Sequence, residues 1–193
     1  MPCSPGGARG RRTGYPREGR AFRNGEPNGP GAAPGDWRTQ VLAWLGFVGL
    51  CLLVAVADGA VTASSVHGWY TSLRPAPGTP PGWVFGPVWT VLYVLIGSAA
   101  WLVWRRPVAA ARSALLLWGW QLLLNAAWTP AFFGLHSPAL ALGVIVALLV
   151  LIGLTVRAFA RVAPAAAALM LPYVVWTCYA TYLNAAVLWL NPF

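Results

Sequence analysis

Five long apolar segments constrain the fold of this chain more than any other feature. They cover approximately residues 39–58, 83–104, 113–133, 139–160 and 165–189. Each is close to the roughly 20 residues that an α-helix needs to cross the hydrocarbon core of a bilayer. The period-two alternation of β-strands is missing, and in lipid only helices and closed barrels can pair all their backbone polar groups. The sequence therefore predicts an all-α integral membrane protein, a bundle of five transmembrane helices.

The composition supports this class. Of the residues, 58% are hydrophobic and only 9% are charged, too few to cover a water-facing surface. The three cysteines, Cys3, Cys51 and Cys178, are far apart in the sequence. We interpret them as small packing residues, since neither a disulfide framework nor a zinc site follows from such spacing. No metal site and no cofactor are expected.

The chain divides into a polar tail and a membrane domain. Residues 1–36 are rich in Arg, Gly and Pro and hold almost no aliphatic residues. Such a segment cannot bury enough apolar surface to offset its ordering entropy, so we predict a disordered cytoplasmic tail. Residues 37–193 form the predicted membrane domain.

Arginine placement predicts the orientation. The tail and the connections 105–112 and 157–164 carry nearly all of the arginines, whereas the alternate connections hold only Arg74 or none. By the positive-inside rule the N-terminus is cytoplasmic, and the C-terminus and the loop 59–82 are outside. The expected location is the bacterial cytoplasmic membrane.

One alternative concerns the first segment. Ala55, Val56 and Ala57 precede Asp58 in a pattern that resembles a signal-peptidase site behind a basic region and an apolar core. Cleavage there would leave four helices and a mature chain that begins at Asp58. We favour five spans, because the segment is long for a signal peptide and its removal would take away a packing partner.

The segment Trp69–Trp89 is rich in proline and tryptophan and leads directly into the second span. Prolines fix φ, so this loop loses little entropy when it orders over a ligand. We therefore predict that this loop meets a ligand. The alternative is that Trp69 and Trp83 anchor the chain at the membrane surface and that the prolines only end helices.

Three spans carry aromatic and amide side chains at steps of three and four residues, which place each set on one helix face. Amides that face lipid are costly, so these should point into the bundle and converge in its outer half. We predict a pocket for a large, flat, mostly apolar ligand; the alternative is interhelical hydrogen bonds that build no site. The candidate residues are Trp89, Tyr93, Gln121, Asn125, Trp128, Tyr173, Trp176, Ala180 and Asn184.

The sequence lacks the residues that several classes of membrane protein and enzyme require. No Asp, Glu, Lys or Arg is predicted near the middle of a span, and Asp58 is placed at the outer end of the first helix. Ion-coupled pumping is therefore not expected, since pumps need intramembrane ionisable groups. His67 and His136 are interpreted as surface residues rather than haem ligands. The sequence has no phosphate-binding loop and no hydrolase motif.

Small residues and prolines predict local packing. Gly82 and Gly86 form a GxxxG pair, and together with Gly97 they are expected to allow close helix approach. Pro87 and Pro172 are expected to bend the second and fifth helices beside the pocket.

From about residue 40 to 191 the chain resembles the TspO/MBR family of tryptophan-rich sensory proteins and translocator proteins. The motifs are W-Y-x-S-L (69–73), P-P-x-W-V-F-x-P-V-W-T-x-L-Y (80–93), Q-L-x-L-N-x-x-W (121–128), F-F-G (132–134) and P-Y-x-x-W-x-x-x-A-x-x-L-N (172–184).

The resemblance implies a five-helix fold that usually forms a homodimer and binds porphyrins, such as protoporphyrin IX or haem. It places the ligand pocket at Trp89, Asn125, Trp128, Trp176, Ala180 and Asn184, with the loop around Trp69 and Pro80 over the opening. Trp89 and Trp176 match family tryptophans implicated in porphyrin degradation. Family members are associated with tetrapyrrole traffic, stress signalling and light-dependent porphyrin breakdown.

The chain departs from the family in three places. The loop has residues 76–79 where the family often has an aromatic residue. No Lys or Arg follows Tyr182, so the sterol motif of the mitochondrial members is absent. Leu116 and Trp120 occupy the small-residue patch through which members dimerise, which disfavours that packing.

Three functions remain in order of preference. The first is a membrane receptor or carrier that binds porphyrins and similar ligands. The second is an enzyme for light- and oxygen-dependent porphyrin degradation, with Trp89 and Trp176 as its catalytic residues. The third is a regulatory partner protein that acts through residues 1–36. The expected partners are a porphyrin ligand, membrane lipid and a second copy of the chain; nucleic acid is not expected.

Overall fold

The structure is a computed structural model that describes residues 1, 36–66 and 68–191. Its five long helices are α1 (Trp37–Val66), α2 (Phe85–Trp104), α3 (Ala109–Thr129), α4 (Pro138–Val162) and α5 (Pro164–Leu190). Three short helical turns, η1 (Trp69–Ser72), η2 (Gly82–Val84) and η3 (Pro130–Gly134), lie between them. Every regular element in these residues is helical, which confirms the all-α class. The predicted tail, except Met1 and Asp36, lies outside the described residues, as do Cys3 and His67.

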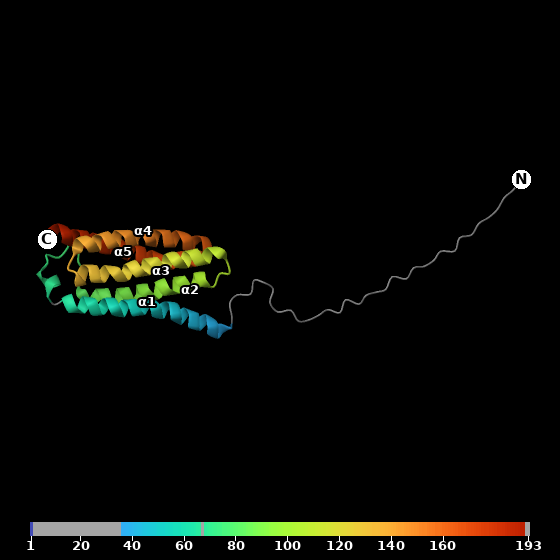
Figure 1. Cartoon of the computed structure of the whole chain (residues 1–193), viewed down its shortest axis with the longest axis horizontal. Coiled ribbons are helices and arrows are strands. Elements are labelled where there is room, and N and C mark those ends of the chain that lie inside the picture. Colours follow the sequence, from blue (N-terminus) through green and yellow to red (C-terminus); the bar gives the residue numbers. More distant parts are fainter. Residues whose placement is uncertain (2–35, 67, 192–193) are drawn as a thin grey trace. The chain divides into compact units, whose positions relative to one another are not determined.

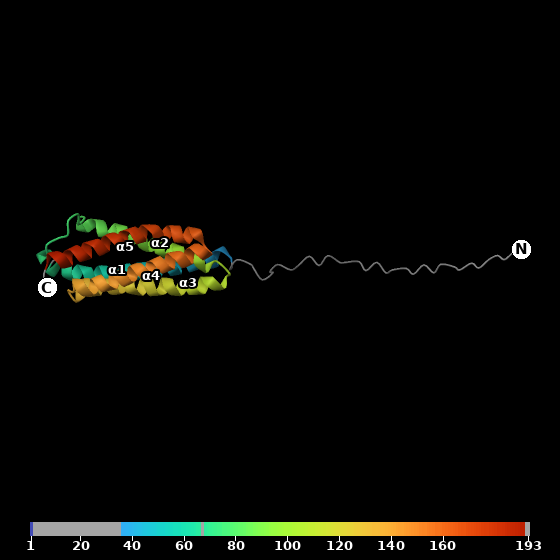
Figure 2. The ribbon, with the colours of Figure 1, turned by 90° about the horizontal axis from the view of Figure 1, so that it is seen from above.

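The five helices lie side by side as one bundle (Figure 1), and the view from above shows the same arrangement (Figure 2). Four of them, α1, α2 with η2, α4 and α5, are long and apolar enough to cross a membrane. The fifth, α3, has 21 residues but contains Arg112, Gln121 and Asn125, which lower its mean hydropathy. Its packing against α4 is nearly as extensive as that between α4 and α5. The five-helix bundle predicted from the apolar segments is confirmed.

Proline and serine define where the last two helices begin. The hydroxyl of Ser137 accepts a hydrogen bond from the Leu140 backbone N–H at 3.4 Å, and Pro138 occupies the first turn of α4. Pro164 begins α5 after the single extended residue Ala163. Proline is favoured at this position because the first helical N–H groups have no intrahelical partner. This short connection forces α4 and α5 to pack as antiparallel neighbours.

The first helix is longer than predicted. α1 continues to Val66, so the prediction that Asp58 lies at its outer end is wrong: about two further turns follow it. Residues 59–66 are small and only weakly apolar, so the hydropathy signal fades although nothing there breaks a helix. Thr62 donates a hydrogen bond to the Asp58 carbonyl at 2.8 Å, so its hydroxyl is satisfied along the helix.

A glycine sets the distance between α1 and α2. A Cβ at Gly97 would lie 2.7 Å from the Cα of Val48, so the two backbones are in direct contact there. This confirms the predicted close approach at Gly97. The same prediction for Gly82 and Gly86 is wrong within this chain, because a Cβ at either position would have nothing within 4 Å. Both face open space at the start of α2.

We expect Gly97→Ala to destabilise the bundle by about 1–3 kcal/mol, because the added methyl group must push two backbones apart. Gly86→Ala on the same helix is the matched control and should be neutral or slightly stabilising, since alanine favours helix and the space is open. Free energies of unfolding in detergent measure both. Equal stability of the two variants would contradict the close contact at Gly97.

Candidate ligand-binding site

The loop between α1 and α2 is tied to α5 by tyrosine hydroxyls. Tyr179 donates a hydrogen bond to the Gly78 carbonyl at 2.6 Å, and Tyr182 donates one to the Pro77 carbonyl at 3.1 Å. Gly78 has a φ of 81°, a left-handed conformation that glycine adopts without strain. Ala76 is buried in the same turn. The segment 76–79, which departs from the family pattern, is therefore a fixed contact between the loop and α5.

The start of the loop packs on η3 and on His136, which follows it. The Trp69 ring lies 5.7 Å from the Phe132 ring and stacks on the exposed His136 imidazole at 4.5 Å, measured between centroids. Pro80 is half-buried further along, whereas Trp83 is 76% exposed. Tyr70 lies 5.5 Å from Phe133, and burial raises the pKa of its phenol. Trp69 is thus part of an aromatic contact, whereas Trp83 contacts no other aromatic ring among residues 36–66 and 68–191.

A chain of hydrogen bonds joins four helices in the interior. The Tyr93 hydroxyl on α2 lies 3.0 Å from the Asp58 carboxylate on α1 and 2.5 Å from the Asn125 side-chain oxygen on α3. The Asn125 amide donates to the Tyr173 hydroxyl on α5 at 2.9 Å. Thr129 on α3 also hydrogen-bonds to Asp58. We call Asp58, Tyr93, Asn125, Thr129 and Tyr173 the buried polar cluster.

A second polar contact joins α3, α4 and α5. The Trp128 indole N–H donates to the Asn184 side-chain oxygen at 3.1 Å. The Asn184 amide in turn donates to the Pro138 carbonyl at 2.8 Å, at the start of α4. The Trp128 ring stacks on Phe132, 5.4 Å away, which connects this contact to the ring of Trp69. Sequence analysis predicted inward amides, and both Asn125 and Asn184 point inward and are paired.

Trp89 lies against the buried polar cluster. Its ring centroid is 5.5 Å from that of Tyr93 and 6.2 Å from that of Tyr173. Ala180, half-buried on α5, packs against the same core. Three predicted residues on α2, α3 and α5, namely Tyr93, Asn125 and Tyr173, are therefore in direct contact, and Trp89 is adjacent to two of them.

Two of the predicted site residues have polar atoms without a hydrogen-bond partner. The Gln121 side chain is fully buried, and both its amide oxygen and its amide nitrogen are unpaired among the described residues. The Trp176 indole nitrogen is likewise buried and unpaired in this part of the chain. An unpaired buried polar group costs about 1–3 kcal/mol, so such atoms mark places where a ligand or water gains a hydrogen bond.

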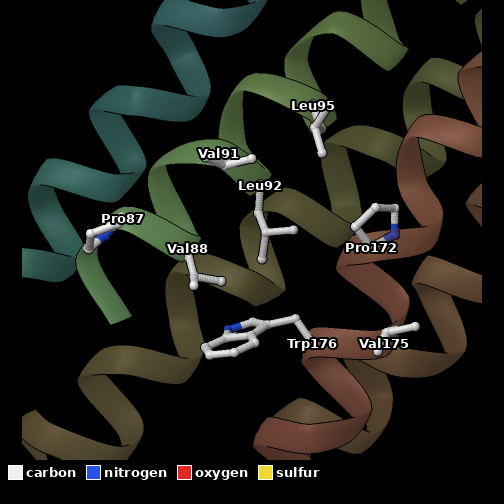
Figure 3. A pocket seen from close by; sticks show the side chains of 8 residues that line it. All are labelled: Pro87, Val88, Val91, Leu92, Leu95, Pro172, Val175 and Trp176. Atoms are coloured by element: carbon white, nitrogen blue, oxygen red, sulfur yellow. The ribbon is translucent and has the colours of Figure 1, made fainter. Parts of the chain in front are cut away.

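An apolar groove of about 530 Å³ lies between α2 and α5. Trp176 extends from α5 toward Val88 of α2 across this groove, and Leu92 of the same helix points toward the Trp176 ring (Figure 3). Phe85 meets the Trp176 ring at 5.8 Å. Pro87 and Pro172 both line the groove. The complete lining is Pro87, Val88, Val91, Leu92, Leu95, Pro172, Val175 and Trp176.

The structure thus separates the predicted residues into three places. Trp176 borders the groove, the cluster around Asn125 fills the interior, and Trp128 packs through Phe132 against Trp69 of the loop. Sequence reasoning missed Asp58 as a member of the interior cluster. Continuing α1 beyond residue 58 would have found it, because the residues that follow contain no proline. The aliphatic residues of the groove could not be recognised from the sequence, since valine and leucine are equally common at the lipid-facing positions of a transmembrane helix.

Phenylalanine substitutions test the buried polar cluster, because they keep both aromatic rings. Tyr173→Phe removes one hydrogen bond and should cost about 0.6 kcal/mol, the average for such bonds between membrane helices. Tyr93→Phe should cost about 1–3 kcal/mol, because it removes the hydroxyl that lies within hydrogen-bond distance of both Asp58 and Asn125 and so leaves a buried acceptor unpaired. Unfolding free energies in detergent measure this order, and a Tyr93→Phe variant as stable as the parent would contradict it.

Comparison with known proteins identifies the family. The model of the TspO/MBR family matches residues 47–190. A tryptophan-rich protein TspO of Chlorobaculum tepidum is 39% identical over 79% of this chain and 98% of its own length. The bovine translocator protein is 35% identical over 73% of this chain and 87% of its own. A tryptophan-rich sensory protein of Cereibacter sphaeroides is 37% identical over 64% and 77%, respectively. The chain is an integral membrane protein and belongs to the TspO/MBR family.

Proposed function

We propose that this protein is a membrane receptor or carrier that binds porphyrins, such as protoporphyrin IX or haem, at the groove between α2 and α5. The observation that carries the proposal is Trp176: its ring borders an apolar groove, and its indole N–H is buried without a partner. A flat aromatic ligand with acceptor atoms would stack on this ring and accept its hydrogen bond.

The groove has the size and chemistry that such a ligand requires. Its volume of about 530 Å³ lies within the range of roughly 300–1,000 Å³ typical of small-molecule sites. Its walls are aliphatic and aromatic. Pro87 and Pro172 have no backbone N–H, so the carbonyl one turn before each proline lacks its usual helical donor and is a polar group beside the groove. An apolar ligand dissolved in the bilayer would reach this face directly from lipid.

The interior residues support the groove from behind. Trp89 lies between the groove residue Val88 and the cluster residue Tyr93 in the sequence of α2, and its ring is held by Tyr93 and Tyr173. In this proposal Trp89 supports the groove from the interior side without lining it. The names of the relatives, translocator and sensory protein, agree with a receptor or carrier.

The proposal includes an orientation in the bacterial cytoplasmic membrane. Most arginines of the membrane domain lie at one end of the bundle. They are Arg38 at the start of α1, Arg105 and Arg106 after α2, Arg112 near the start of α3 and Arg161 near the end of α4. Only Arg74 lies in the loop at the opposite end among residues 36–66 and 68–191. By the positive-inside rule the arginine-rich end faces the cytoplasm, and the Trp69 loop faces outward.

Titration of the full-length protein with protoporphyrin IX in the dark, followed by tryptophan fluorescence, tests the proposal. We expect Trp176→Phe to weaken binding about tenfold, because the variant keeps an aromatic ring but loses the N–H donor. Trp83→Phe is the matched control, since this exposed tryptophan lies outside the groove and should bind as the parent does. Unchanged affinity of Trp176→Phe would refute the assignment of the site.

A second candidate function is light-dependent oxidation of the bound porphyrin. The specific observation in its favour is that the Trp89 ring touches two tyrosines, so an oxidised indole would have electron donors within contact distance. Illumination with oxygen should then produce an open-chain tetrapyrrole, and Trp89→Phe should slow its formation at least tenfold without weakening dark binding to the same degree. Binding without any spectral change of the porphyrin in light would exclude this activity.

A further inference from the structure

A second groove, of about 240 Å³, lies between α1 and α2 at the arginine-rich end of the bundle. It is lined by Gln40, Val41 and Trp44 of α1 and by Trp101 of α2. It is separate from the groove at Trp176, because none of its residues borders both. Nothing in the proposed porphyrin site uses it.

The two tryptophans of this groove are held in fixed positions. The Trp101 indole N–H donates to the Gln40 carbonyl at 3.0 Å, and the Trp44 indole N–H donates to the Ser98 hydroxyl at 3.0 Å. Each bond crosses from one helix to the other. Since both N–H groups are satisfied within the protein, the indoles offer the groove only their hydrocarbon surfaces. These surfaces suit an acyl chain rather than a polar ligand.

Positive charge lies at the mouth of the groove. The Arg105 guanidinium is stacked 4.6 Å over the Trp101 ring, one helical turn beyond the groove wall. On α1, the Arg38 guanidinium lies 5.7 Å from the Trp37 ring, one turn before Val41. Stacking on tryptophan favours these positions by cation–π attraction and leaves the edge N–H groups of each arginine available for an anion.

The charge at this end is strongly unbalanced. Six arginines are near it, and Asp36 is the single acidic side chain there within residues 36–66 and 68–191. A phosphate group would therefore meet an attractive field as well as individual guanidinium groups. The depth of the site in the membrane also fits a phospholipid. The arginines lie at the helix ends, at the depth of the lipid headgroups, and the groove continues from there about two helical turns into the apolar span, at the depth of the acyl chains.

We propose that an anionic phospholipid binds here, with its phosphate at Arg105 and Arg38 and one acyl chain in the groove between α1 and α2. The site is independent of the porphyrin site and gives the protein a preference for anionic over zwitterionic lipid. The bound acyl chain would cover the parts of the Val41 and Trp44 side chains that α2 leaves exposed.

Native mass spectrometry of the full-length protein in detergent tests the proposal, with phosphatidylglycerol and phosphatidylcholine of identical acyl chains as probes. Tighter binding of phosphatidylglycerol is expected. Arg105→Gln should weaken that binding about fivefold and weaken the binding of phosphatidylcholine less, because the choline cation already offsets the charge of its phosphate. Trp44→Ala, which shortens the groove wall, should weaken the binding of both lipids.

Arg161→Gln is the matched control, because this arginine is at the same end of the bundle but on α4, away from the groove. It should keep the affinity for phosphatidylglycerol. Equal binding of both lipids to the parent protein, or an equal loss in Arg161→Gln and Arg105→Gln, would overturn the proposal. Displacement of the lipid by the same concentration of inorganic phosphate would also overturn it, because the acyl chain would then contribute nothing.

Discussion

The hydrogen-bond chain from Asp58 through Tyr93 and Asn125 to Tyr173 is the interaction on which the rest of the bundle depends. It joins α1, α2, α3 and α5 in a region where lipid offers no hydrogen-bond partners. Apolar side chains alone would let these helices slide or rotate, because lipid tails solvate leucine as well as another helix does. The polar groups remove that freedom, since each helix has one rotation that satisfies them. Gly97 complements this by fixing how closely α1 approaches α2.

This interior has a consequence for ligand binding. The aromatic and amide side chains that the sequence places on three facing helices occupy the interior with one another. The larger of the two grooves instead lies on the face between α2 and α5, at the two helix prolines. Trp176 is the one residue of the sequence-predicted set that borders it, and its indole N–H is buried and unpaired among the described residues. The proposed site would suit a ligand that partitions into lipid.

Much of the fold could be predicted from the sequence because the bilayer sets a single length scale. Apolar run length predicted the helices, and spacing predicted that Tyr93, Asn125, Tyr173 and Asn184 face inward. The errors have local physical causes. Asp58 was misplaced because helical structure continues where hydropathy declines, and Gly82 and Gly86 were misjudged because a GxxxG pattern does not reveal which face meets a neighbour. The groove itself could not be predicted, because it depends on how two helices separate and not on any distinctive residue.

The measurement that tests the central claim most directly is nuclear magnetic resonance of the indole N–H of Trp176 in the ¹⁵N-labelled protein. Trp176→Phe assigns its resonance among the twelve tryptophans of the chain. Addition of protoporphyrin IX in the dark should shift this resonance strongly, as its unpaired donor gains an acceptor and its ring gains a stacked partner. The resonance of the exposed Trp83 should remain in place. A Trp176 resonance that stays unchanged while the porphyrin binds would contradict the account.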